Sequence, residues 1–491
     1  MVHRATHSRA RGRISTALVV TVIVAALSAW LGFATTGFPA ALAPPAEVPS
    51  RIRIDNARIV SMVPGAPEVQ TGNSVLVVDG VIRAVGPPDV LDTGTDVLVV
   101  DAAGQTLLPG LIDAHVHLWD EAELCGYLAH GVTSVRNMGG MPFHLDLARR
   151  IEQGELLGPD FLTTGPILNS PGPNQQRIHQ LVVTADDARA AVRAQYAAGY
   201  RTLKLYSNLN REAYDAIRDE AHKLGMNYVG HTAEGFRGEG VPYDRPFAIP
   251  FEDVLDDGYQ TIEHVESIVW HGLRDRLDPV AMRELAGRIA RAGVVVTPTL
   301  IAHDNLVRVA SSRGAYLHRP GTETLNPLLQ WFEAGNQEFW SAQDPEAREA
   351  PRAVFYRQAT LMLHQAGVPL IAGTDAGIFT NIPGSSMTRE LELLVESGLT
   401  AHEAIATATA VAGPALGLPD RGQVAPGFRA NLLLVAQDPL RDVSVLEQPE
   451  AVMIRGVWLD AAALARLRQG ARDTSVLRTA RRLAAMLWAI H

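Results

Sequence analysis

The chain has 491 residues, of which 47% are hydrophobic and 20% are charged, and its formal net charge is −10. This length and composition predict an ordered protein with one large catalytic domain and a smaller satellite, and its single cysteine, Cys125, excludes a disulfide within the chain. The negative charge argues against nucleic acid as the main partner, because phosphate binding needs a basic surface, and it favours a small-molecule substrate.

The first predicted element is an export segment over residues 1–46. Four arginines precede a stretch from Ile14 to Ala46 that carries no charge and has an apolar centre from Ala17 to Phe33. Basic residues before such a run hold the amino end in the cytoplasm, so the rest of the chain is exported. The segment fits both a cleaved signal peptide and a retained membrane anchor. We therefore expect a secreted or periplasmic protein, or one anchored to the membrane and facing outward.

Short strands are predicted on both sides of the chain's central part. Residues 50–110 contain RIRIDNARIVSM, SVLVVDGVIRAVG and DVLVVDAAGQTLLPG, which alternate apolar and polar residues and break at Asp-Gly and Pro. They predict a small antiparallel sheet. Residues 418–460 contain the matching runs ANLLLVAQDP and EAVMIRGVWLD. We expect both ends of the chain to build one small β-sandwich-like satellite domain.

Residues 111–417 alternate short apolar runs with helical patterns. The eight runs are LIDAHVH, SVRNM, DFLTTG, TLKLY, NYVGH, QTIEH, VVVTPTL and PLIAGTD. They predict an α/β fold. Eight such units favour the (β/α)8 TIM barrel rather than a doubly wound sheet. An irregular insertion around Asp304–Arg352 would cover the active site. The sequence of residues 461–491 predicts a basic helix that packs against the rest of the protein. The alternative is that this helix binds a membrane surface.

Candidate metal ligands stand at the ends of these predicted strands. His115 and His117 are two residues apart, so both imidazoles point to the same face at the barrel mouth. Other strands end with polar residues that can join them: Lys204 in TLKLY, His231 in YVGHTAE, His264 in TIEHVE and Asp375 in AGTDAG. Each residue alone has a structural explanation, such as a core histidine or a helix N-cap. Those explanations do not account for the fact that every candidate ligand falls at the end of a predicted strand.

These motifs, with GVTSVRNMGG, RELELLVESGLTAHEAIATAT and GQVAPGFRANLLLV, resemble the amidohydrolase superfamily. The resemblance is to its imidazolonepropionase-like and prolidase-like branch, whose barrel carries a carboxylated lysine. It covers the predicted barrel and both parts of the satellite, and not the leader or the last 30 or so residues. Two positions depart from the family pattern: Asn137 stands where aspartate is frequent, and Thr388 where histidine is frequent.

The resemblance implies a site with two divalent metal ions. In it, His115, His117 and Asp375 hold one ion, His231 and His264 hold the other, and a carbamate on Lys204 bridges them. Imidazole and carboxylate ligands favour Zn(II). Two cations would lower the pKa of a shared water, so that hydroxide is available near neutral pH to attack a carbonyl. Asp375 would accept the proton and pass it to the leaving amine.

Lys204 is the residue that separates this site from a mononuclear one. It shares a strand face with Tyr206, opposite two leucines, and lysine is almost never buried without a partner. A pair of cations would disfavour its ammonium and favour a neutral amine that reacts with carbon dioxide. Tyr206 is a candidate hydrogen-bond donor to the oxyanion or a substrate carboxylate. The alternative is that Tyr206 only packs against its neighbours. His179 and His303 are further candidates for substrate contacts.

The sequence therefore predicts a metal-dependent amidohydrolase of small substrates such as Xaa-Pro-like dipeptides or N-acyl amino acids. One alternative is a deaminase or a hydrolase of cyclic amides or lactones with one metal. Another is an inactive scaffold, which the presence of all the predicted ligands disfavours. The sequence leaves open the exact substrate and whether the chains assemble into a homo-oligomer.

Overall fold

The computed structural model describes residues 37–91, 94, 96–235 and 247–490. Most of the predicted export segment, residues 1–36, lies outside them. The end of that segment is described: η1 (Ala40–Leu42) packs on α2 (Ala122–Ala129) and α15 (Ala461–Gly470), and Leu42 is fully buried. The described helices include none that is long and apolar enough to span a bilayer.

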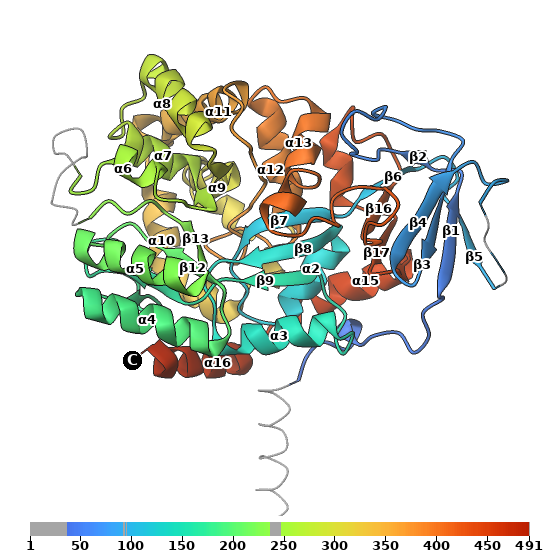
Figure 1. Cartoon of the computed structure of the whole chain (residues 1–491), viewed down its shortest axis with the longest axis horizontal. Helices are drawn as coiled ribbons and strands as arrows, with labels where there is room; N and C mark the ends of the chain where they lie inside the picture. The colour runs from blue at the N-terminus through green and yellow to red at the C-terminus, as the bar shows by residue number, and fades with distance from the viewer. Residues whose placement is uncertain (1–36, 92–93, 95, 236–246, 491) are drawn as a thin grey trace, which may run out of the picture.

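Two parallel sheets form the centre of the molecule (Figure 1). The first has the order β7-β8-β9, with β7 (Leu111–Val116), β8 (Val132–Asn137) and β9 (Asp160–Thr163). The second has the order β11-β10-β12-β13-β14-β15, with β10 (Ile167–Asn169), β11 (Gln180–Leu181), β12 (Thr202–Leu205), β13 (Asn227–Gly230), β14 (Thr261–Glu263) and β15 (Val295–Thr297). All of these pairs are parallel, so the chain is an α/β protein in which crossover segments join the strands.

Helices join successive strands and cover their outer faces. They are α3 (Pro142–Glu152), α4 (Ala185–Ala198), α5 (Arg211–Leu224), α6 (Phe251–Leu255), α7 (Val265–Gly272) and α8 (Pro279–Ala292). Local sequence explains their limits. The Thr184 hydroxyl caps α4 by accepting a hydrogen bond from the backbone N–H of Asp187, and the helix ends at Gly199, whose φ of 114° is left-handed.

The third predicted strand, DFLTTG, is divided between the two sheets. It begins as β9, and the chain resumes as β10 after Pro166. Between them, the backbone N–H of Thr164 donates to Asn137 of β8, and that of Gly165 donates to Thr202 of β12. The segment therefore passes from one sheet to the other.

The eighth predicted strand, PLIAGTD, is not a regular strand. It makes two isolated parallel bridges, at Leu370 to β15 and at Ala376 to β7. The carboxylate of Asp113 accepts hydrogen bonds from the backbone N–H and the hydroxyl of Thr374, at 3.1 and 2.6 Å, and Asp375 has a φ of 56°. The hydrogen bonds from Thr374 to Asp113 and the left-handed conformation of Asp375 thus interrupt the regular strand pairing at the predicted site residue Asp375.

The insertion around residues 304–352 is helical, so the prediction of an irregular segment is wrong. It contains most of α9 (Leu300–Ser311), all of α10 (Pro327–Ala342) and the start of α11 (Glu349–Gln365), with short 3-10 turns between them. Asn326 caps α10 and Pro327 occupies its first turn. Trp331 and Phe332 are exposed on this helix, so its apolar pattern does not mark a single buried face.

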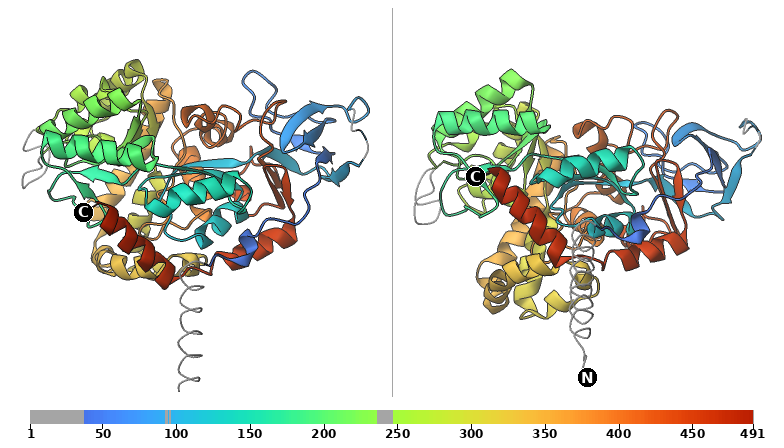
Figure 2. Two further views of the ribbon diagram at one scale, coloured as in Figure 1. Left: turned by 60° about the horizontal axis from the view of Figure 1, so that its bottom comes forward. Right: turned by 90° about the horizontal axis from the view of Figure 1, so that it is seen from below.

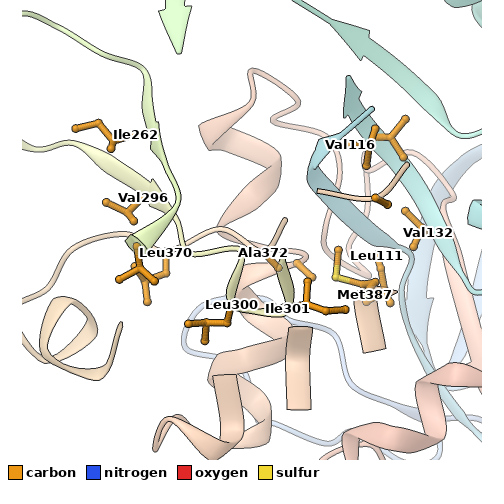
Figure 3. Close-up of a cluster of buried hydrophobic side chains, with 14 of the residues drawn as sticks. Leu111, Val116, Val132, Ile262, Val296, Leu300, Ile301, Leu370, Ala372 and Met387 are labelled. Carbon is orange, nitrogen blue, oxygen red and sulfur yellow. The ribbon is translucent and has the colours of Figure 1, made fainter. Parts of the chain in front are cut away.

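Apolar side chains fill the space inside the sheets and beneath the helices. Figure 3 shows part of this core, where Ile262, Val296 and Leu370 approach from one side and Leu111, Val116 and Val132 from the other. Leu300 and Ile301 of α9, and Met387 of α12 (Ser385–Glu396), close the cluster. The strands are therefore held as a rigid platform for the residues at their carboxyl ends.

Strands from the two ends of the chain form two further sheets beside this centre (Figure 1). One has the order β4-β3-β1-β5, with β1 (Arg51–Asp55), β3 (Ser74–Val78), β4 (Val81–Gly86) and β5 (Leu98–Asp101). The other has the order β18-β17-β16-β6-β2, with β2 (Arg58–Ile59), β6 (Thr106–Pro109), β16 (Leu432–Val435), β17 (Ala451–Ile454) and β18 (Val457–Leu459). Both ends of the chain thus contribute strands to one sheet. The prediction of a wholly antiparallel sheet is wrong, because β1 pairs with β5 and β2 with β6 in parallel.

The carboxyl-terminal segment is two helices and not the single predicted one. α15 packs on α2, and α16 (Val476–Ile490) packs on α3 and α10. Figure 2 shows both helices on the face seen from below, with η1 beside α15. The remaining elements are α13 (Ala401–Thr407), α14 (Ala412–Ala415), η3 (Ala315–His318), η4 (Thr322–Thr324), η5 (Pro345–Ala347) and η6 (Val443–Glu447). The division of the chain into domains at residues 110, 417 and 460 stays a prediction.

Candidate metal centre

The residues predicted to bind metal line one cavity of about 490 Å³. They are His115, His117, Lys204, His231, His264 and Asp375, and Tyr206 lines the same cavity. Each lies in, or within two residues after, a central parallel strand or the bridged segment beside β7. The cavity therefore opens at the carboxyl ends of the strands, where parallel α/β proteins place their sites.

His115, His117 and Asp375 form the tightest group. One ligand atom from each lies within 4.8 Å of the others. Oδ1 of Asp375 is 3.3 Å from Nε2 of His115 and 3.1 Å from Nε2 of His117. Burial would raise the pKa of Asp375, but the hydrogen bond from His117 and the nearby imidazoles outweigh it and hold the pKa well below its usual range. Asp375 is therefore a carboxylate that faces two imidazoles.

His231 and His264 lie directly beside this group. Their ring centroids are 4.5 Å apart, and that of His264 is 4.7 Å from that of His115. Burial lowers the pKa of all three imidazoles below the ordinary histidine value. They are therefore neutral at pH 7, which is the form of histidine that binds a metal ion.

Lys204 is almost completely buried, with 1% of its surface exposed. Its Nζ makes no hydrogen bond to any residue that the structure describes. Burial lowers its pKa to about 8, although the carboxylates of Glu263 and Asp375 act in the opposite direction. A substantial fraction of this amine is therefore neutral in mildly alkaline solution, and a buried amine without a partner is costly unless another group satisfies it.

The residues around the cavity fit a metal pair. Within the described ranges, Nε2 of His115 and Nδ1 of His231 also lack hydrogen bonds. Nε2 of His115 is close to Asp375 but does not have the geometry of a hydrogen bond. Buried nitrogens without partners are the atoms that bound cations would satisfy, and this set of nitrogen and oxygen donors suits Zn(II).

Glu263 orients His115, and it is not among the site residues predicted from the sequence. Its Oε2 accepts a hydrogen bond from Nδ1 of His115 at 2.8 Å, and its Oε1 accepts one from Arg136 at 2.8 Å. With Nδ1 holding the proton, Nε2 of His115 presents its lone pair to the cavity. The available signal was the position of Glu263 next to His264 in TIEHVE. The contact partner, 148 residues away, gave no local signal.

His264 and Asp375 both have left-handed backbone conformations, with φ of 68° and 56°. Such φ values are uncommon for residues other than glycine and cost conformational energy. Nδ1 of His264 is 2.6 Å from the hydroxyl of Thr299, and the Asn381 amide donates to the backbone carbonyl of Asp375. Neighbouring side chains therefore fix both residues in the conformation that aims them at the cavity.

Tyr206 lies between two histidines on the cavity wall. The centroid of its ring is 4.6 Å from that of His179 and 4.1 Å from that of His231. His179 lines the cavity, and its Nδ1 is engaged by Asn169. His303 also lines it, but its Nε2 already bonds the backbone carbonyl of Glu349 at 3.0 Å.

Asn137 and Thr388, the two positions that depart from the family pattern, lie in different parts of the molecule. The side chain of Asn137 accepts a hydrogen bond from the backbone N–H of Leu118 and donates one to Thr163. Asn137 therefore holds the backbone directly after His117. Thr388 lies in another cavity, between α12 and η6, and does not line the metal centre.

Comparison with known proteins gives consistent results. The model of the amidohydrolase family matches residues 126–459. An imidazolonepropionase from Geobacillus kaustophilus is 27% identical over 389 residues, which cover 74% of this chain and 83% of that protein. The solved structure of a bottromycin amidohydrolase superposes with a TM-score of 0.70 at 23% identity, covering 91% of this chain and 96% of the other. That of a Xaa-Pro dipeptidase gives 0.63 at 22% identity, covering 84% and 100%.

Proposed function

The chain belongs to the amidohydrolase family, since the family model matches more than half of its length, and on that premise we propose that it is a two-metal hydrolase of dipeptides or N-acyl amino acids. Family membership makes it a hydrolase of amide bonds that acts on a small molecule. The metal dependence, the number of ions and the substrate class are the proposal.

One observation carries the proposal. Three predicted metal ligands that line one cavity, His115, Lys204 and His231, each have a buried nitrogen without a hydrogen-bond partner among the described residues, and Nε2 of His179 on the same cavity has none either. A packed core does not keep such atoms together without compensation. Two cations bridged through Lys204 would satisfy all three, with the remaining ligands supplied by His117, His264 and Asp375 in the same cavity.

The barrel is the second part of the proposal. Backbone bonds link β9 through residues 164–165 to β12, and the bridged segment at residues 370–376 joins β15 to β7. We propose that these links close the two sheets into one (β/α)8 barrel, with the sheets from the chain ends as its satellite domain. Closure would fix the spacing of side chains contributed by five different segments.

The amine of Lys204 can become the bridging ligand. Its neutral form attacks carbon dioxide, so that a nitrogen–carbon bond forms and one proton is released, leaving a carbamate. The lowered pKa of Lys204 increases the neutral fraction that can react. The carbamate replaces a cation by an anion, which the positive charge of two metal ions favours.

The chain's other residues supply proton transfer and orientation. When bound, the metal ions make a water molecule acidic and polarise the scissile carbonyl. Asp375 is ionised and can accept a proton at Oδ1, and it can return that proton to the leaving amine, which must be protonated before it departs. Tyr206, on the wall beside His231, would donate a hydrogen bond to the oxyanion or to a substrate carboxylate.

A one-metal enzyme is the second candidate. Among the described residues, the compact group that could hold an ion contains only His115, His117 and Asp375. Such a group suits a deaminase or a hydrolase of cyclic amides. This alternative gives no role to the buried amine of Lys204.

A metal count and a substrate panel test the proposal. We expect about two Zn(II) per chain by emission spectroscopy, and hydrolysis of dipeptides or N-acyl amino acids. One ion per chain, with activity confined to cyclic amides, lactones or deamination, would establish the second candidate. An enzyme inactive on the whole panel with two bound ions would exclude the proposed substrate class.

Export is also a proposal, and it rests on the four arginines and the uncharged stretch at Ile14–Ala46. Fractionation of cells that express the full chain would test it. We expect the protein outside the cytoplasmic membrane, either released or membrane-bound. Recovery in the cytosol alone would overturn export.

A further inference from the structure

The carboxyl-terminal helix α16 lies outside the residues that match the family model, yet it contacts the segment that follows His117. We propose that Arg478 and Arg482 of α16 are positioning residues for the metal centre, which act through residues 119–121. This inference rests on the proposed function, because it assigns the helix a role in metal binding and turnover.

The contacts between α16 and this segment are buried and directional. Nε and one terminal nitrogen of Arg478 donate to the two carboxylate oxygens of Asp120, at 2.9 and 2.7 Å. Arg482 donates to the carboxylate of Glu121 and, at 3.3 Å, to the backbone carbonyl of Trp119. Each of the four charged residues has less than a tenth of its surface exposed. The helix therefore holds three consecutive residues.

Trp119 connects this segment to the metal centre. Its ring is nearly parallel to that of His117, with an angle of 17° and a centroid distance of 6.5 Å. Its Nε1 donates to the backbone carbonyl of Gly377 at 2.9 Å, two residues after Asp375. Trp119 thus contacts both chain segments that contribute the tightest group of ligands.

Apolar side chains also hold α16 against the segment that contains Trp119. Trp119 forms a buried cluster with Met141, with Leu329 of α10 and with Met486 of α16. The guanidinium of Arg482 lies over the ring of Phe143 at 4.1 Å. The arginines are therefore fixed between packed groups and are not mobile surface side chains.

The charges explain why the helix would affect the site. The carboxylates of Asp120 and Glu121 are buried three and four residues after His117. Without their arginines, they would have to move toward water, because an unpaired buried charge is strongly destabilising. That movement would displace Trp119 and loosen the position of His117. If α16 only adds stability, in contrast, its loss would leave metal affinity unchanged.

Arg478→Lys in the full-length protein tests the inference. Lysine keeps the charge but loses the paired geometry to Asp120. Arg421→Lys is the matched control, since Arg421 donates to buried Asp160 at 2.9 Å and is equally buried, and neither residue lines the metal cavity. The readouts are Tm, the Zn(II) dissociation constant from competition with a chromogenic chelator, and kcat and KM separately.

We expect both variants to lower Tm, and only Arg478→Lys to weaken Zn(II) binding, by about tenfold or more, and to lower kcat. A Zn(II) dissociation constant and kcat equal to wild type in Arg478→Lys, or an equal shift in the control, would overturn the inference. If Arg478→Lys does not fold, Trp119→Phe decides, because it removes the bond to Gly377 while α16 stays paired; unchanged Zn(II) affinity would then refute the role. A wild-type protein that binds no metal would instead refute the proposed function.

Discussion

The candidate metal centre and the cluster around Asp160 both bury ionisable groups, but only in the Asp160 cluster is every buried charge paired with another residue. Oδ2 of Asp160 accepts hydrogen bonds from Arg421 and Asn431, both at 2.9 Å. Oδ1 accepts from Arg429 at 3.2 Å and from Arg455 at 3.1 Å. This cluster joins β9 to the carboxyl-terminal part of the chain, and its charges are satisfied by the chain itself.

The metal centre has the opposite character. The nitrogen atoms of Lys204, His115 and His231 that face its cavity have no partner within the described residues. Two of its residues, His264 and Asp375, also have left-handed backbone conformations. The difference indicates that charges with a structural role are paired by other residues, whereas those of a binding site are held ready for a ligand. The two clusters should therefore respond differently to substitution.

The largest effect is expected for Lys204→Ala. Loss of the bridging group should remove at least one metal ion and lower kcat/KM by more than about 100-fold. Added short carboxylic acids should restore part of the activity by occupying the bridging position. Lys223→Ala is the control, because Lys223 is exposed on α5 and pairs with Asp219. Two ions and full activity in Lys204→Ala would exclude the carbamate role.

Asp375→Asn should lower kcat by about 100- to 10,000-fold, because an amide cannot accept and return the proton. Its shape is nearly that of aspartate, so the circular dichroism spectrum should match that of the wild type. Steady-state kinetics with the best substrate of the panel would measure the change. Turnover near that of the wild type would show that another group carries the proton.

Glu263→Gln should have a smaller effect, because glutamine can still accept a hydrogen bond from His115. It loses the charge that pairs with Arg136 and that strengthens the imidazole as a ligand. We expect Zn(II) affinity to fall by about 10- to 100-fold. Chelator competition would measure it, and an unchanged dissociation constant would mean that the position of His115 does not depend on this carboxylate.

Asp160→Asn should leave kcat/KM of the folded protein unchanged while lowering the free energy of unfolding by about 3–5 kcal/mol. The reason is that three arginines lose their common carboxylate. Chemical denaturation and kinetics on the same preparation would separate the two quantities. A large loss of kcat/KM at full folding would contradict the division between a structural and a functional cluster.

The same cluster predicts a pH dependence. Burial would raise the pKa of Asp160, but Arg421, Arg455 and Arg429 outweigh it and lower the pKa below the ordinary value of 3.8. The unfolded state then takes up the proton first as the pH falls, so this stabilisation is present above about pH 4 and is lost as the pH falls through the folded-state pKa. The stability difference between wild type and Asp160→Asn should therefore shrink below pH 4. A constant difference from pH 7 to pH 3 would contradict this account.

The local features of the fold could be read from the sequence because they depend on neighbouring residues. Alternation in TLKLY predicted β12, and His-x-His predicted two imidazoles on one strand face. The interruption at residues 370–376 could not be predicted, because it depends on Asp113 bonding to Thr374 across 261 residues. The helical insertion was missed because exposed aromatic residues obscured the amphipathic pattern of α10.

For the site, the sequence determined which residues line the cavity, since strand ends, imidazoles and the lone strand lysine are visible in short motifs. Only the tertiary structure decided what holds them. Glu263 reaches His115, and Arg478 reaches Asp120 across 358 residues. The physical reason is that a ligand's identity is a property of one position, whereas its orientation depends on long-range contacts that form only when the sheets and the last helix have packed.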